Sequence, residues 1–160
     1  ADVADRRAYL GRADRTVGFG GGMLGLFNTT VRSGIELVLD LAHGREACAW
    51  ADVIITGEGS IDSQTPYGKV PSGIAKLAQS QGKPTIAIGG TGTRDPHTIE
   101  ALNETGIVAT FGIAPGPADL ATLIANTERN VEITCAAIAG TLRVASATAV
   151  TAATSPCESA

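Results

Sequence analysis

The sequence has few aromatic residues, few charged residues and no long apolar run. Aromatic side chains make up 4% of the 160 residues. Charged side chains make up 18%, whereas an average soluble domain has roughly 25% charged residues. A membrane-spanning helix needs about 18 uncharged apolar residues in succession. The Ala- and Thr-rich C-terminal part comes closest, but Glu132 and Arg143 interrupt it. The sequence also shows no basic segment followed by an apolar one, the pattern that is typical of a secretory leader. We therefore expect a soluble, cytoplasmic protein with no membrane partner.

Cysteine is also scarce, and the basic residues are not clustered. Cys48, Cys135 and Cys157 are odd in number and far apart, which favours reduced thiols over a disulfide framework or a metal-ligand set. The 12 Lys and Arg face 16 Asp and Glu, for a net charge of −4. Because nucleic-acid binding needs a concentrated basic face, we expect no nucleic-acid partner.

Glycine, by contrast, is abundant. It accounts for 20 of the 160 residues, against roughly 7% in an average protein. Hydrophobic residues make up 44%, which excludes wholesale disorder. A chain of this length is long enough to form one domain with its own core.

Three short, nearly all-apolar runs predict buried strands, at residues 52–56, 84–88 and 106–111. Each run is followed by a turn rich in Gly, Pro, Asp or Ser and then by a helical pattern. The expected helices cover residues 72–81, the region 97–104, and the sequence from 118 onward. This repeat of strand, loop and helix predicts an α/β fold with three layers and a mostly parallel sheet, Rossmann-like or flavodoxin-like.

The remaining segments set the expected limits of this domain. Ser33 and Glu36 have the spacing of a capping box that begins a helix, and a short helix is expected at residues 47–50. One or two Ala-rich helices are expected within residues 120–149. We predict a poorly ordered segment at residues 1–17, an α/β domain at 18–150 and a disordered tail at 151–160.

The turn after the first predicted strand is the richest in chemistry. In an open parallel sheet, ligands bind beyond the carboxyl ends of the strands. Glycine amides and a following helix N-terminus favour an anion there, carboxylates suit Mg²⁺, and a lysine neutralises charge on a phosphoryl group. The turn therefore predicts phosphate chemistry, although a purely structural Gly-rich turn is the alternative. Its polar and Gly residues are Gly57, Glu58, Gly59, Ser60, Asp62, Ser63, Gln64, Thr65, Gly68 and Lys69.

General phosphate-binding motifs do not describe this turn. In a Walker A loop Ser or Thr follows Gly-Lys, whereas Val70 follows here, and Ser63 replaces the first required Gly. Ile61 and Asp62 interrupt a G-x-G-x-x-G fingerprint. The turn after the second predicted strand, with Gly90 and Thr91, is a second candidate wall of a ligand site, or a plain turn.

Two other features of the sequence point to a ligand less strongly. The glycines at residues 20–22 either present amides to an anion or allow close helix packing. His43 and His97 are isolated and have no partner at a metal-ligand spacing.

The string ITGEGSIDSQTPYGKVPSGIAKLA, residues 55–78, resembles the most diagnostic segment of the type I glycerate kinases. Two further stretches are similar to that family: GKPTIAIGGTGT at 82–93 and SGIELVLDLA at 33–42, the latter after a Gly-rich run at 18–23. The resemblance covers about residues 18–150. Family members are more than twice as long, so the chain resembles their C-terminal portion without the N-terminal half.

The resemblance implies ATP-dependent phosphorylation of D-glycerate to a phosphoglycerate, with Mg²⁺, in a fold of two α/β domains around a cleft. Seven residues occupy positions that match the family pattern: Gly57, Glu58, Gly59, Asp62, Gln64, Gly68 and Lys69. The resemblance itself assigns no roles to them.

Chemistry suggests roles for these residues as hypotheses. Asp62 would ligate Mg²⁺ or accept the proton of the glycerate hydroxyl, and Glu58 would hold the metal or a substrate hydroxyl. Lys69 would contact a phosphate or the glycerate carboxylate. The amides of Gly57 and Gly59 would lie against an oxyanion, and the other candidates for binding substrate or nucleotide are Ser60, Gln64, Thr65, Gly68, Gly90 and Thr91.

A different class of function remains as an alternative. The chain would then be a non-catalytic α/β remnant that binds an anion or a nucleotide. In either case a missing half would leave apolar surface bare, which predicts self-association or pairing with that half. We expect little or no turnover from this chain alone, because a kinase must enclose both substrates and exclude water.

Overall fold

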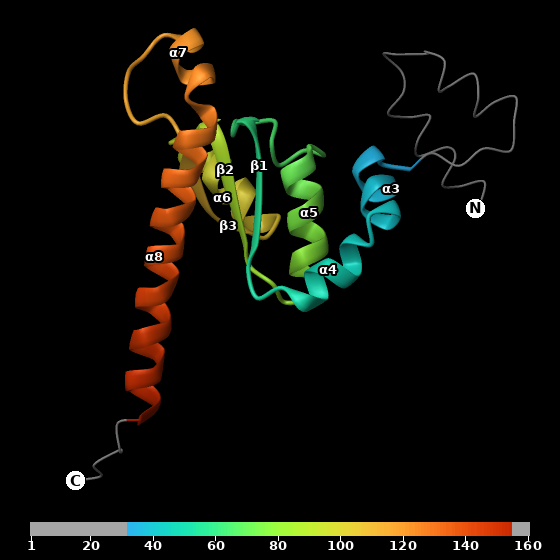
Figure 1. Cartoon of the computed structure of the whole chain (residues 1–160). Coiled ribbons are helices and arrows are strands. Elements are labelled where there is room, and N and C mark those ends of the chain that lie inside the picture. Colours follow the sequence, from blue (N-terminus) through green and yellow to red (C-terminus); the bar gives the residue numbers. More distant parts are fainter. Residues whose placement is uncertain (1–31, 155–160) are drawn as a thin grey trace, which may run out of the picture.

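The computed structural model describes the backbone of residues 32–154 and the side chains of residues 32–146 (Figure 1). Three parallel strands form its sheet, in the order β1-β2-β3. They are β1 (Ile54–Ser60), β2 (Thr85–Thr91) and β3 (Ile107–Gly112). The predicted parallel α/β fold is confirmed. The expected segment at 1–17, the glycines at 20–22 and residues 155–160 lie outside the described residues.

Strands β1 and β2 extend further than the sequence indicated. Residues 57–60 and 89–91 were expected in turns, but they continue the strands, with Glu58 opposite Gly89 and Ser60 opposite Thr91. A Cβ at Gly57 would lie 2.7 Å from the carbonyl oxygen of Ile88. Glycine at this position therefore allows close contact between strands, and the Gly-rich composition had disguised strand as turn.

Helices cover both faces of the sheet. Helices α5 (Val70–Gln79) and α6 (Pro96–Glu104) lie on one face, and α8 (Thr127–Thr154) runs along the other, after the short α7 (Leu120–Ala125) (Figure 1). This is the expected arrangement of three layers. The long helix α8 continues to Thr154, so residues 151–154 belong to a helix rather than to the predicted disordered tail.

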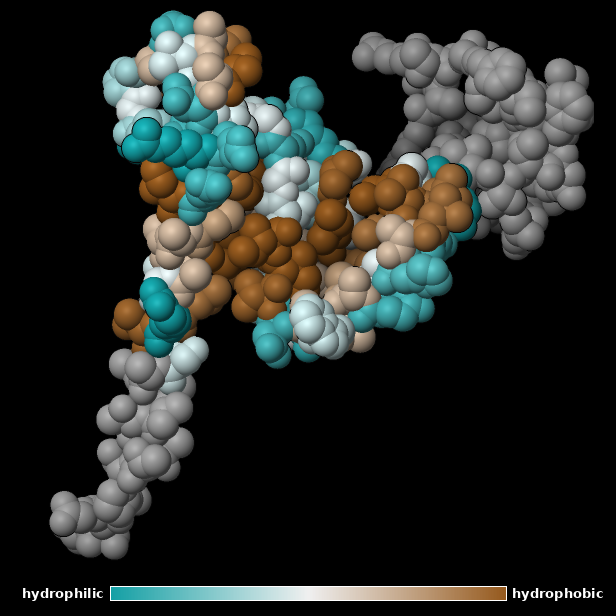
Figure 2. All heavy atoms as spheres, in the orientation of Figure 1, coloured by the Kyte–Doolittle hydropathy of each residue, from teal (hydrophilic) through white to brown (hydrophobic). Residues whose placement is uncertain are grey.

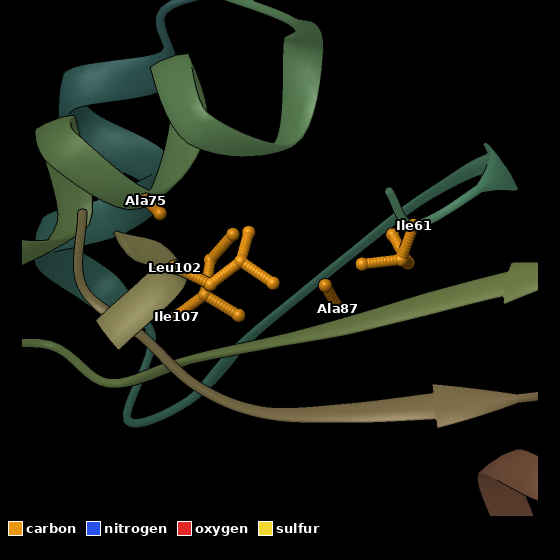
Figure 3. Packing of buried hydrophobic residues seen from close by; sticks show 5 residues of the cluster. All are labelled: Ile61, Ala75, Ala87, Leu102 and Ile107. Carbon is orange, nitrogen blue, oxygen red and sulfur yellow. The ribbon is translucent and has the colours of Figure 1, made fainter. Parts of the chain in front are cut away.

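The core lies between the sheet and the helices α5 and α6. Figure 3 shows its five side chains, all at most 2% exposed: Ile61, Ala75, Ala87, Leu102 and Ile107. Ala75 on α5 and Ala87 on β2 are small, so the helix lies close to the strand, and the branched side chains fill the remaining space. The end of β1 is thereby held in place through Ile61, the first residue of the following loop.

Two further helices pack outside this core, α3 (Gly34–Leu41) and α4 (Gly44–Trp50). Ser33 takes the N-cap position of α3 as expected, but its side chain makes no capping hydrogen bond, so the predicted capping box does not form in full. No residue of α3 is buried, and Leu37, Val38 and Leu41 are 47–74% exposed. Figure 2 shows apolar surface over this helix and over the middle of the same face. None of the described helices is both long enough and apolar enough to cross a membrane.

Leu102 offers a test of this core, because it is 1% exposed between α6 and the sheet. Leu102→Ala removes buried contacts and leaves a cavity, so we expect the free energy of unfolding to fall by about 2–5 kcal/mol. Ile99→Ala on the same helix, at a side chain that is 38% exposed, is the matched control and should cost about 1 kcal/mol or less. Urea unfolding followed by circular dichroism measures both. Equal losses in the two variants would contradict the assignment of the core.

Candidate functional site

The loop that follows β1 is rigidly anchored on both sides of Asp62. Ile61 before it is 2% exposed, and Thr65 after it is fully buried. The Asp62 amide donates to Thr65 Oγ1 at 3.0 Å, and the Thr65 amide donates to the Asp62 carbonyl at 3.0 Å. The Gln64 amide donates to Asp62 Oδ1 at 2.8 Å. This local turn fixes the Asp62 carboxylate at the carboxyl end of the sheet.

Three charged side chains of this short segment meet at the loop. Lys69 Nζ lies 3.0 Å from Asp62 Oδ1, 3.2 Å from Asp62 Oδ2 and 3.8 Å from Glu58 Oε2. Glu58 also accepts a hydrogen bond from the buried hydroxyl of Thr65. We call Glu58, Asp62 and Lys69 the carboxylate–lysine cluster. Two carboxylates and one ammonium leave it with a formal charge of −1.

The cluster is partly open to solvent. The side chain of Asp62 is 44% exposed, that of Lys69 32% and that of Glu58 18%. The pKa of the Asp62 carboxyl is lowered, chiefly because the Gln64 amide donates to it and secondly because Lys69 does. Asp62 is therefore ionised at neutral pH and is a weak base, with its charge held ready for an electrostatic role.

Helix α5 positions Lys69. Lys69 is the N-cap residue of that helix, and the preceding Gly68 has φ +91°, in the left-handed region that favours glycine. The fully buried Ser72 donates its hydroxyl to the Lys69 carbonyl at 2.9 Å and accepts from the Gly68 amide at 3.3 Å. Ser72 was not among the predicted site residues, although Ser in the first turn of a predicted helix is the signal that could have found it.

The other residues predicted for the site lie either near the strand ends and the loop after β1 or in the wall of a neighbouring cavity. The hydroxyls of Ser60 and Thr91 lie 2.8 Å apart and share a hydrogen bond across the ends of β1 and β2. Gln64 is exposed and contributes its backbone amide to the cluster. Gly57, Gly59 and Gly90 line a cavity beside these strand ends.

That cavity has a volume of about 530 Å³ and is bounded by strand ends and by the last two helices. Its walls come mainly from glycines and from aliphatic side chains of β2, α7 and α8, with Glu58 and Thr91 at one side. The sequence indicated the strand side of this cavity but not its helix side. The overlooked signal was a single amide residue, Asn130, within an Ala-rich helix; the structure places Asn130 in the cavity wall.

The comparisons with known proteins agree with one another. Residues 14–143 match the model of the glycerate kinase family. The chain is 40% identical over 129 residues to a glycerate kinase of Bacillus cereus and 37% identical over 128 residues to a glycerate kinase of Bacillus subtilis. These matches cover 81% and 80% of this chain but 33% of each relative. The chain therefore spans about a third of the length of these curated relatives.

A solved structure has the same fold. The crystal structure of a protein described as glycerate kinase 2, from Salmonella typhimurium LT2, superposes with a TM-score of 0.59 at 36% identity. The match covers 81% of this chain and 32% of that one. The resemblance found in the ITGEG segment is thus confirmed over most of the sequence, and the chain belongs to the glycerate kinase family.

Proposed function

We propose that this chain forms the catalytic wall of an ATP-dependent glycerate kinase, which phosphorylates a hydroxyl of D-glycerate to give a phosphoglycerate. The observation that carries the proposal is the carboxylate–lysine cluster at the carboxyl end of β1. Family membership supports the choice of substrate. The second wall, in this proposal, comes from the part of the relatives' length that the match leaves out.

The reaction forms a bond between the hydroxyl oxygen of glycerate and the γ-phosphorus, and breaks the bond from that phosphorus to ADP. Catalysis of such a transfer rests mainly on positioning and on stabilising charge. Lys69 supplies a positive charge for a phosphate or for the glycerate carboxylate. The lowered pKa of Asp62 favours an orienting role toward the hydroxyl, with the proton accepted only as the new bond forms.

The described residues fit Mg²⁺ only when phosphate oxygens share it. They contain no group of three His, Cys, Asp or Glu side chains that could hold a metal ion. Mg²⁺ in kinases is commonly bound by one or two carboxylates together with substrate phosphates, and Glu58 and Asp62 supply two carboxylates around one cation, the Lys69 ammonium. We propose these two residues as its ligands. When bound, Mg²⁺ neutralises charge on the phosphates.

We also propose the cytoplasm as the location of the enzyme. The described residues Cys48 and Cys135 are both free thiols. Unpaired cysteines of this kind are typical of a reducing compartment.

A hybrid enzyme tests the proposed function. Residues 14–143 of this chain would replace the matching third of the Bacillus cereus relative. With ATP and D-glycerate, we expect the hybrid to release ADP in a coupled assay, and this chain alone to release little or none. A folded hybrid without turnover would contradict the proposal and favour the non-catalytic alternative.

Substitutions in the hybrid test the cluster. Asp62→Asn and Lys69→Met each remove one charge at nearly constant shape, and we expect each to lower kcat/KM by about 100-fold or more. Asp52→Asn is the matched control, because Asp52 is exposed and lies before the opposite end of β1; it should leave kcat/KM unchanged. A near-normal rate in Asp62→Asn would remove Asp62 from the mechanism.

The lowered pKa of Asp62 has a measurable pH dependence. A carboxyl whose pKa is lower in the folded state stabilises the fold above its unfolded pKa, and loses that contribution as the pH falls through the folded value. We expect carboxyl ¹³C NMR of this chain to place the Asp62 titration below that of an ordinary aspartate. Lys69→Met should raise this pKa only in part, because the Gln64 amide is the larger cause. A titration at the ordinary value would contradict the geometry of the loop.

A further inference from the structure

The cavity beside the strand ends contains a polar side chain that the fold does not use. Asn130 of α8 lines the cavity and is only 8% exposed. Its backbone amide donates to the Asn126 carbonyl at 3.0 Å, but its side-chain amide has no hydrogen-bond partner among the described residues. The donor and the acceptor of this amide are therefore free to pair with a ligand in the cavity.

The rest of the cavity suits a flat, apolar group. Ile88, Ile113, Leu123 and Val131 supply aliphatic walls. A Cβ built at Gly59 would meet no atom within 4 Å, so this glycine leaves open space over the strand end instead of serving strand contact. The volume of about 530 Å³ lies within the range of roughly 300–1,000 Å³ for small-molecule sites.

The cavity borders the charged cluster. Glu58 belongs to both, since it lines the cavity and its carboxylate lies 3.8 Å from Lys69 Nζ. A ligand that fills both places has a flat ring at one end and an anionic group at the other. A nucleotide has this form, and the carboxyl ends of parallel strands are where nucleotides bind in open α/β sheets.

We propose that this cavity binds the adenine ring of the nucleotide, with the side-chain amide of Asn130 hydrogen-bonded to the edge of the ring. An amide presents one donor and one acceptor side by side, and the amino group and ring nitrogen of adenine are their complements. Guanine presents two acceptors at the same edge and matches the amide less well. This inference rests on the proposed kinase function for the identity of the nucleotide, but its test does not require turnover.

Binding of adenosine, which has no phosphate, tests the ring site alone. Saturation-transfer NMR of this chain should show contact with the adenine protons of adenosine, and a weaker signal from guanosine. Asn130→Leu keeps the size and removes the amide, so we expect the adenosine signal to fall at least about tenfold. Asn103→Ala, at an exposed helical asparagine on α6, is the control and should bind adenosine as the unmodified chain does.

Two further measurements separate the possible failures. Asn130→Leu should melt at the same or a higher temperature, because an amide on a mostly apolar cavity wall is replaced by an apolar side chain of similar size; if it unfolds, Asn130→Ala takes its place. Inorganic tripolyphosphate, followed by ³¹P line broadening, should bind equally to Asn130→Leu and less well to Lys69→Met.

Absent adenosine binding, or binding that Asn130 does not affect, would overturn the ring site even if the hybrid enzyme is active. Adenosine binding that depends on Asn130, with an inactive hybrid, would uphold the ring site and refute the kinase function.

Discussion

The close parallel pairing of β1 with β2 is the constraint on which the candidate site depends. At the carboxyl ends of these strands glycines face backbone across the pair, and a Cβ at Gly57 or Gly90 would lie within 2.7 Å of a carbonyl oxygen of the neighbouring strand. Side chains at these positions would force the strands apart. Because the strands stay paired to their ends, Ser60 and Thr91 meet, and the loop after β1 leaves the sheet at a defined point.

From that point a short loop follows, in which buried and charged residues alternate and the buried ones hold the loop in place. Ile61 joins the core, Asp62 turns toward solvent, and Thr65 returns to the interior, where its hydroxyl reaches Glu58. Lys69 at the start of α5 then lies against both carboxylates. A loop anchored in this way is pre-organised, so the charges of the cluster are already held in place by the fold.

The two faces of the sheet have different roles. The face under α5 and α6 contains the core and supports the charged cluster, whereas the face toward α7 and α8 leaves a cavity with mostly apolar walls. Glu58 lies where the two meet. An amphipathic ligand can bridge such a boundary, and a chain that spans about a third of its relatives can contain this boundary intact while other walls come from elsewhere.

The parallel α/β class could be predicted from the sequence alone, because three apolar runs that are each followed by a turn and a helical pattern have few other solutions. The sequence also marked Glu58, Asp62, Thr65 and Lys69 as candidates, and the structure brings these four side chains together; their roles are a proposal. Tertiary structure decided the rest. Whether Gly57 and Gly90 belong to strand or turn depends on the neighbouring strand, which local pattern does not contain. Asn130 lines one cavity together with residues some 70 positions earlier in the chain. This depends on how α8 packs across the sheet, because long-range packing is set by the whole fold and not by any single segment.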